Sequence, residues 1–262
     1  MKKLIGVFLS LMLGISCVGM TACNKETLIV YTEAGFAPWE TTRGTEIVGV
    51  DIEIAQAIAD ELGWNLQIVN GNFDTIMAGI NEDNALGIAG ITKNAEREEV
   101  LEFSKTYATA RQAILYKAGA LTPDEETGEM PVSVFEGKRV GVQTGTTGNF
   151  AVDDHWEEWG IVKDSEASPA RCYAQVSAAV LDMGTNIDYV IIDSLVAKQL
   201  ADSDPTLEWA VIAGLELEEY AVAAKKGNTE LIATVNEVLD RLLTKDDEGQ
   251  TQIDKWVVEY SV

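Results

Sequence analysis

The strongest constraint on the fold of this chain is an alternation of short apolar runs with segments of helical periodicity. In the first part, strand-like runs occur at 27–33, 65–69 and 86–92, with helical segments at 51–63 and 73–80 between them. Asp51 is expected to cap the first helix and Gly63 to end it. Strands joined through helices over short connections pair in parallel, so this order predicts an α/β fold with a mostly parallel sheet covered by helices.

The alternation restarts after an acidic loop with proline and glycine at 122–131. A strand at 111–117 leads into this second unit. Its further expected elements are strands at 138–143, 189–193, 208–213 and 219–226, and helices that run to about 159 and over about 170–183. Two helices close the chain, the first with an apolar stripe of Leu231, Val235, Val238, Leu239 and Leu242. Two units of similar size predict two lobes, with a ligand at the carboxyl ends of the strands or between the lobes.

Charge and residue counts exclude several classes of function. The chain has 262 residues, with 19 Lys and Arg against 43 Asp and Glu, a formal net charge of −24. Such a surface repels phosphate backbones, so we expect no nucleic-acid partner. We interpret the acidity as a solubility feature, with attraction of a cationic ligand as the alternative. A single histidine, His155, leaves no material for histidine metal clusters or Ser-His-Asp triads, and we expect neither a metal nor a cofactor.

The first residues have the pattern of a secretion signal. Lys2 and Lys3 precede a short apolar run that is interrupted by glycine, unlike a retained membrane-spanning helix, and ends in small residues before Cys23. The segment MTAC at 20–23 resembles the lipobox of bacterial lipoproteins, in which the cysteine is acylated. Residues 1–22 are therefore predicted to be a lipoprotein signal peptide and Cys23 a lipid anchor in the cell membrane. A chance cysteine at an ordinary signal, or an uncleaved anchor, is the alternative.

A turn rich in threonine and glycine, Thr144 to Gly148, follows the expected strand at 138–143 and opens a helix. Backbone N–H groups at the positive end of a helix bind anions, so the turn is interpreted as an anion site. A nucleotide loop is the alternative, but no lysine follows the turn as in a P-loop, and the GxGxxG pattern is absent.

Four segments in a fixed order carry a resemblance over nearly the whole mature chain. They are TEAGFAPWE at 32–40 with VGVDIEIAQAIADELG at 48–63, NFDTIMAGI at 72–80, AGITKNAEREEVLEFSKTY at 89–107, and VGVQTGTTG at 140–148 with YVIID at 189–193. In this order they resemble the amino-acid-binding proteins of polar amino acid ABC importers, the bacterial extracellular solute-binding proteins of family 3. The resemblance implies a two-lobed, periplasmic-binding-protein-like α/β fold of type II with two hinge crossings between the lobes.

The resemblance also implies where the charged groups of an amino acid bind. Arg97 matches the carboxylate-binding arginine, whose planar fork suits that group, with Thr92 and the backbone at Gly90 as supporting donors. An arginine paired with neighbouring glutamates on a surface helix is the alternative. Asp193, which ends the YVIID strand, matches the amine-binding aspartate, and a helix N-cap is its other possible role.

The remaining site residues follow from the same resemblance. Gln143, Thr146 and Thr147 are expected beside the ligand carboxylate from the second lobe. Phe36 and Phe73 match the aromatic walls of the site, with packing in the core as the alternative. Glu33 is expected to contact the ligand side chain, which the acid favours as cationic or as an amide.

The predicted function is extracytoplasmic capture of a free amino acid and its delivery to the permease of an ABC importer by hinge closure. Lobe one is expected over about 27–108 and 222–262, and lobe two over about 113–217. We expect a monomer without enzymatic activity. Two alternatives stay open: an amino-acid-sensing lipoprotein that partners a receptor, and a dehydratase-type enzyme in which Glu33 and Asp193 transfer protons.

Overall fold

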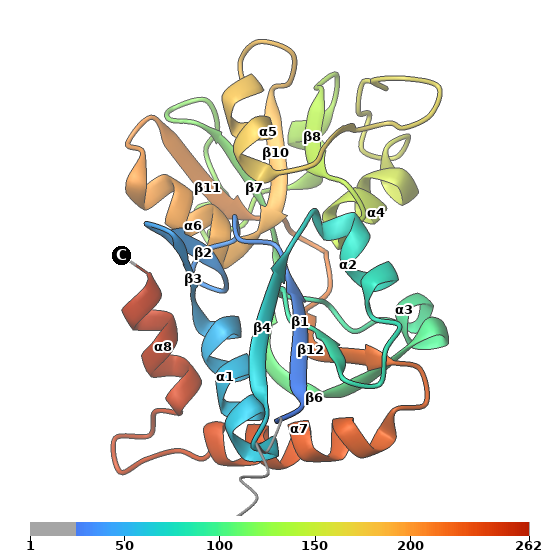
Figure 1. Ribbon diagram of the computed structural model, residues 1–262. Coiled ribbons are helices and arrows are strands. Elements are labelled where there is room, and N and C mark those ends of the chain that lie inside the picture. The colour runs from blue at the N-terminus through green and yellow to red at the C-terminus, as the bar shows by residue number, and fades with distance from the viewer. Residues whose placement is uncertain (1–24, 262) are drawn as a thin grey trace, which may run out of the picture.

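The computed structural model of the chain describes residues 25–261, so the predicted leader and Cys23 lie outside the described part. The described chain forms two α/β lobes, one above the other in Figure 1, each with a five-stranded sheet and helices packed against it. The predicted two-lobed α/β fold is therefore confirmed. Within residues 25–261, every helix is too short or too polar to cross a membrane.

The sheet of lobe one has the strand order β4-β1-β5-β12-β6. Its strands are β1 Thr27–Thr32, β4 Asn65–Asn70, β5 Ala85–Gly87, β6 Leu101–Ala110 and β12 Glu218–Lys225, and a separate hairpin consists of β2 Thr41–Arg43 and β3 Glu46–Val48. β1 pairs in parallel with β4 and β5, whereas β12 pairs antiparallel with β5 and β6. The prediction of a mostly parallel sheet is wrong for half of these pairings, because β12 returns from the other lobe and enters the sheet in the opposite direction.

Helix α1 (Val50–Leu62) begins at a different residue from the predicted one. Its N-cap is Gly49, whose φ of 139° and closeness to the carbonyl of Trp39 leave no room for a side chain. Asp51 lies in the first turn, fully buried, and accepts a hydrogen bond from the N–H of Gly90 at 2.8 Å. Gly63 ends the helix in the left-handed conformation, as predicted. The other helices of this lobe are α2 Phe73–Gly79, α3 Ala95–Val100, α7 Thr229–Leu242 and α8 Gln252–Tyr260.

The sheet of lobe two has the order β11-β7-β10-β8-β9, with β8 parallel to both of its neighbours and β7 antiparallel to both of its own. The elements of this lobe are β7 Gln112–Lys117, the 3₁₀-helix η1 Val132–Phe135, β8 Val140–Gln143, α4 Thr147–His155, β9 Arg171–Tyr173, α5 Val176–Asp182, β10 Tyr189–Asp193, α6 Ser194–Ser203 and β11 Leu207–Val211. The helix predicted over about 170–183 is wrong in its first part, because residues 171–173 pair with β8 as an edge strand.

The chain crosses between the lobes twice. β6 of one sheet continues into β7 of the other through Arg111, and the segment between β11 and β12 returns. Three aromatic rings pack at this junction: Trp39 lies edge-on to Tyr107 at 6.0 Å and to Tyr220 at 5.2 Å between ring centroids. The junction is therefore a packed core. The predicted stripe on α7 is buried at Leu231, Val235, Val238 and Leu239, together with Ile232, whereas Leu242 is only partly buried.

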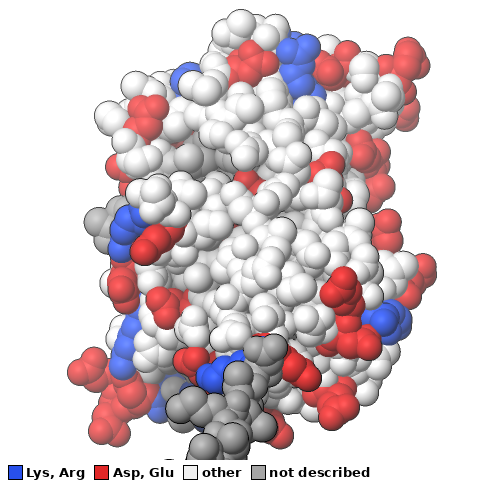
Figure 2. Space-filling view, viewed as in Figure 1, with Lys and Arg blue, Asp and Glu red and all other residues white. Residues whose placement is uncertain are grey.

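Charge is unevenly distributed over the face of the molecule seen in Figure 2. Acidic side chains gather toward the margins of this face, while its central part, which extends over both lobes, is largely uncharged.

Candidate ligand-binding site

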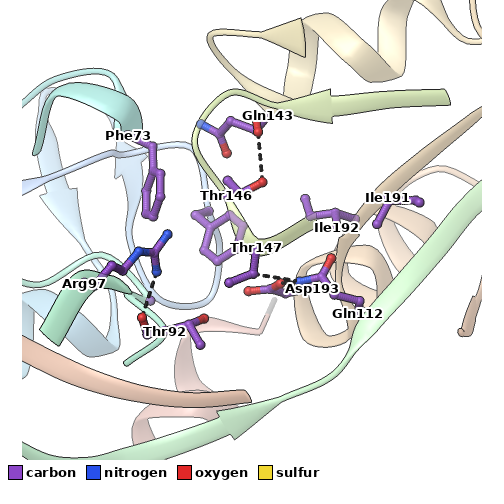
Figure 3. Close-up of a pocket in the computed structure, with 12 residues that line it drawn as sticks. Phe73, Thr92, Arg97, Gln112, Gln143, Thr146, Thr147, Ile191, Ile192 and Asp193 are labelled. Atoms are coloured by element: carbon purple, nitrogen blue, oxygen red, sulfur yellow. Dashed lines mark hydrogen bonds between the residues drawn. The ribbon is translucent and has the colours of Figure 1, made fainter. Parts of the chain in front are cut away.

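A cavity between the lobes gathers most of the predicted site residues (Figure 3). Nine of the ten line it, five from lobe one and four from lobe two: Phe36, Phe73, Gly90, Thr92 and Arg97, then Gln143, Thr146, Thr147 and Asp193. Three lining residues were not predicted, namely Gln112, Ile191 and Ile192. Glu33 is buried but is not one of the lining residues. The structure thus brings the residues together, while their roles toward a ligand stay predictions.

Arg97 is positioned by main-chain groups. It lies in α3, whose N-cap Asn94 accepts a hydrogen bond from the N–H of Arg97 at 2.9 Å. Its guanidinium donates from Nη1 to the carbonyl of Thr92 at 2.8 Å and from Nη2 to the carbonyl of Gly145 at 3.1 Å. Since Gly145 belongs to lobe two, the guanidinium bridges the two lobes. The ring of Phe73 lies 5.6 Å from its Cζ, which is within cation–π distance.

The guanidinium of Arg97 has donor capacity left for a ligand. Its side chain is buried, and Nε has no hydrogen-bond partner among residues 25–261. Burial lowers the pKa of Arg97, and the negative charges of Glu218 and Asp193 oppose this shift. An arginine nevertheless stays protonated in proteins, so this corner is cationic. The alternative pairing with a neighbouring glutamate is not formed in the described chain, where Glu98 pairs instead with Lys93 at 3.2 Å.

Asp193 forms an acidic corner on the opposite side of the cavity (Figure 3). One carboxylate oxygen accepts from the side-chain amide of Gln112 and the other from the hydroxyl of Tyr220. Burial raises the pKa of Asp193 well above its ordinary value, and the charge of Glu218 raises it further, while the Gln112 hydrogen bond and Arg97 oppose the shift. Asp193 occupies the N-cap position of α6, but within the described residues its side chain makes no capping hydrogen bond. The carboxylate therefore makes its hydrogen bonds with Gln112 and Tyr220 and does not cap the helix.

The threonine turn places the start of α4 at the cavity. The hydroxyl of Thr146 donates to the carbonyl of Gln143 at 2.8 Å and accepts from the N–H of Asn149 at 3.2 Å, so it caps α4 from within the turn. The first N–H groups of a helix have no intrahelical acceptor. Because Thr146 and Thr147 line the cavity at this helix end, the geometry fits an anion held by main-chain donors.

The predicted aromatic walls also belong to the core. Phe36 and Phe73 line the cavity, yet each side chain is only 8% exposed. Both residues therefore belong to the core and also line the cavity, and their role as walls for a ligand stays a prediction. Burial raises the pKa of Glu33, and the side chain of Gln143 partly offsets the shift. Since Gln143 lines the cavity, Glu33 lies next to the wall and not in it.

Gly90 is hydrogen-bonded to a buried acid, Asp51, which interacts in turn with the buried Glu40. Its N–H is already donated to Asp51, so it is not an unused donor for a ligand. A β-carbon at position 90 would lie 3.1 Å from the ring of Phe36, and the φ of 54° also favours glycine. Burial raises the pKa of Asp51 to about 6. Burial, together with repulsion from Asp51, raises the pKa of Glu40 well above its ordinary value.

Sequence reasoning missed the side chains that surround Asp193. Gln112, Glu218 and Tyr220 come from the two lobe crossings, far from Asp193 in the chain. The one local signal is a polar residue at the start of an otherwise apolar strand, as in QAILYK at 112–117. Among the described residues, no group of three or more His, Cys, Asp or Glu side chains is arranged to hold a metal ion.

Comparison with known proteins gives consistent matches along the chain. The sequence profile of the bacterial extracellular solute-binding proteins, family 3, matches residues 28–259. The arginine-binding extracellular protein ArtP of Bacillus subtilis (strain 168) is 26% identical over 256 residues, which are 92% of this chain and 94% of ArtP. The putative ABC transporter arginine-binding protein 2 of Escherichia coli (strain K12) is 29% identical over 246 residues, or 90% and 93% of the two chains.

A solved structure extends these matches to three dimensions. It is the amino acid ABC transporter substrate-binding protein AbpA from Streptococcus pneumoniae, bound to L-arginine. It is similar with a TM-score of 0.76 and 29% sequence identity, covering 90% of this chain and 94% of that one. The similarity therefore includes both lobes and the junction between them.

Proposed function

Because the chain belongs to the bacterial extracellular solute-binding proteins, family 3, we propose that it captures a free amino acid with a cationic side chain and delivers it to an ABC importer. The family consists of extracytoplasmic substrate-binding proteins, and its members similar to this chain bind amino acids for ABC transporters. The preference for a cationic side chain is the more specific part of the proposal.

One observation carries the proposal: a buried arginine and a buried aspartate lie on opposite sides of a single cavity between two lobes (Figure 3). Every free amino acid has a carboxylate and an ammonium close together. Arg97 and the main chain at the start of α4 are complementary to the carboxylate, and Asp193 is complementary to the ammonium. Neither pairing requires a reaction, so the site is suited to binding.

The charge balance of the site supports a cationic side chain. Arg97 is opposed by two carboxylates at the cavity, Asp193 and Glu218. A zwitterion brings one charge of each sign and leaves that excess of negative charge in place. A ligand with an additional positive charge neutralises it, and Glu33 beside the wall is the proposed partner. The arginine ligands of the similar proteins agree with this choice.

Hinge closure follows from contacts with both lobes. We infer that residues 27–108 with 222–262 move as one body and residues 113–217 as the other, about the two crossings. A ligand that contacts Arg97 in one lobe and Asp193 in the other interacts fully only when the lobes are together. It therefore stabilises the closed form selectively, which is the form that a permease would recognise.

The attachment of the protein to the cell is also part of the proposal. Residues 1–22 are inferred to be a cleaved signal peptide, and Cys23 the lipid-bearing first residue of a monomeric protein at the membrane. Mass spectrometry of the mature N-terminus tests this inference directly. A diacylated or triacylated cysteine supports the anchor, and an unmodified or uncleaved terminus contradicts it.

Thermal unfolding against a panel of ligands tests the binding function. The protein lacking residues 1–23 is freed of bound ligand by unfolding and refolding, then heated with each of the twenty amino acids, ornithine or cystine. A ligand at a hundred times its Kd adds about 2.7 kcal/mol of stability, or about 5–10 °C in Tm for a chain of this size. Arginine is expected to give the largest shift, and a panel without any shift contradicts the proposal.

The same samples test for turnover. We expect the bound amino acid to be recovered unchanged after prolonged incubation, because the proposed contacts hold its charged groups without changing any bond. Appearance of a product by mass spectrometry would instead favour an enzyme on this fold.

A further inference from the structure

Glu218 joins both lobes at the cavity through three hydrogen bonds. It is the first residue of β12, where the chain re-enters the sheet of lobe one. Its Oε2 accepts from the hydroxyl of Thr92 at 2.7 Å and from the hydroxyl of Thr147 at 3.0 Å. Its Oε1 accepts from the side-chain amide of Gln112 at 3.0 Å. The first of these partners belongs to lobe one and the other two to lobe two.

These contacts decide what the two hydroxyl groups can still do. A threonine hydroxyl has one hydrogen to donate, and an ionised carboxylate can only accept. The hydrogen of each hydroxyl is therefore directed at Glu218. The Thr147 oxygen also lies 3.2 Å from the amide nitrogen of Gln112, whose two hydrogens are shared among Thr147, Asp193 and Glu218. Thr92 keeps its lone pairs, and its side chain lines the cavity.

A hydroxyl in this state cannot donate to a ligand carboxylate. It can accept a hydrogen bond, and the ammonium of an amino acid is a donor that lacks any acceptor capacity. On the basis of the proposed function, we propose that Glu218 is a positioning residue that orients the Thr92 hydroxyl as an acceptor for the ligand ammonium. The ammonium is then shared between Thr92 and Asp193, while the ligand carboxylate is left to Arg97 and the main chain of α4.

Glu218 can be altered with little risk to the fold. It is only partly buried, and the next residue in the chain, Glu219, is exposed and offers a control with the same change of charge. Glu218→Gln keeps the size of the side chain, but its amide group can donate to Thr92 and free the hydroxyl hydrogen to turn toward the cavity. Glu219→Gln makes the same charge change one residue away without touching the threonines.

The test compares two probes in calorimetry: L-arginine, and 5-guanidinopentanoic acid, which is arginine without its α-ammonium. For Glu218→Gln we expect the affinity for arginine to fall about tenfold or more, the size of one charge-assisted hydrogen bond. The affinity for 5-guanidinopentanoic acid should stay at the wild-type value. Glu219→Gln should bind both probes as the wild type does, and matching Tm values establish that the variants are folded.

A second variant makes the inference independent of any local disturbance by Glu218→Gln. Thr92→Val removes the hydroxyl and should lower arginine affinity to a similar extent. In that background Glu218→Gln should cost little more, because the two residues act through one hydrogen bond.

Three results overturn the inference: equal losses for both probes, tighter arginine binding by Glu218→Gln, or additive losses in the double variant. Equal losses would mean that Glu218 supports the structure, and tighter binding that it competes with the ligand carboxylate. If the wild type does not bind arginine, the proposed function for a cationic ligand fails first, and the inference with it.

Discussion

The two charged corners of the cavity are built in different ways. At the cationic corner, Arg97 is held by two main-chain carbonyls and by a helix that its neighbour Asn94 caps. At the acidic corner, Asp193 is held by side chains, from Gln112 and Tyr220, with Glu218 close by. Main-chain partners survive substitution of the residues that bear them, whereas side-chain partners do not. The cationic corner should therefore be robust to most single changes, and the acidic corner sensitive to several.

The largest expected effect is at Arg97 itself. Arg97→Ala removes the fork that is complementary to the carboxylate, and loss of two charge-assisted hydrogen bonds corresponds to about 3–6 kcal/mol, or at least about a hundredfold in Kd. Arg97→Lys keeps the charge without the planar fork and should fall in between. Calorimetry with arginine measures both variants. Arg241→Ala, which removes an exposed arginine paired with Glu61, is the control, and an unchanged Kd for Arg97→Ala would contradict the assignment.

Asp193→Asn should have the next largest effect, about tenfold to a hundredfold in Kd, because one charged partner of the ammonium is lost. This substitution also tests the electrostatics of the acidic corner. An acid binds a proton below its pKa, and protonation removes the charge that attracts the ligand ammonium. Because the pKa of Asp193 is raised, wild-type affinity should decrease as the pH is lowered, and this decrease should begin at a higher pH than for an ordinary aspartate. The affinity of Asp193→Asn should not show this fall. Equal pH dependence in the two proteins would assign the titration to another group.

The smallest expected effect is at the cap of α3. Asn94→Ala should lower the free energy of unfolding by about 1 kcal/mol, because the N–H of Arg97 loses its acceptor. Arginine affinity should change little, since the carbonyls of Thr92 and Gly145 still hold the guanidinium. Urea denaturation and calorimetry measure the two effects, and Asn94→Ser, which can still cap, is the control. A loss of affinity as large as that of Asp193→Asn would show that the cationic corner is not held by the main chain.

The same contrast explains which parts of the site could be predicted. Arg97, Thr92 and Gly90 lie within one short segment, and the threonine turn is another, so local sequence is enough to recognise them. Gln112 and Glu218 lie 106 residues apart, and each is an ordinary polar residue in its own segment. They contact each other only because the two lobe crossings lie side by side in the fold, and no local sequence pattern predicts this contact.

Secondary structure divides along similar lines. The strands β1, β4 and β10 and most of the stripe on α7 were predicted, because apolar periodicity reflects burial directly. The long strand β6 was not predicted, because residues such as Lys105 and Thr106 interrupt its apolar pattern on the less buried side. Asp51 was assigned as a cap from its residue type, but its carboxylate is used as a buried partner for Gly90 and Tyr107.

By itself, the sequence determined the α/β class, the division into two units, the family and most of the cavity lining. These follow from periodicity and from short motifs, which act over a few residues. Only the tertiary structure decided that β11 and β12 pair antiparallel with their neighbours and that Glu33 lies beside the cavity wall. It also decided that Glu218 accepts hydrogen bonds from the hydroxyl groups of Thr92 and Thr147. Each of these depends on which distant groups meet in space, because a hydrogen bond is defined by the positions of both partners and not by either one alone.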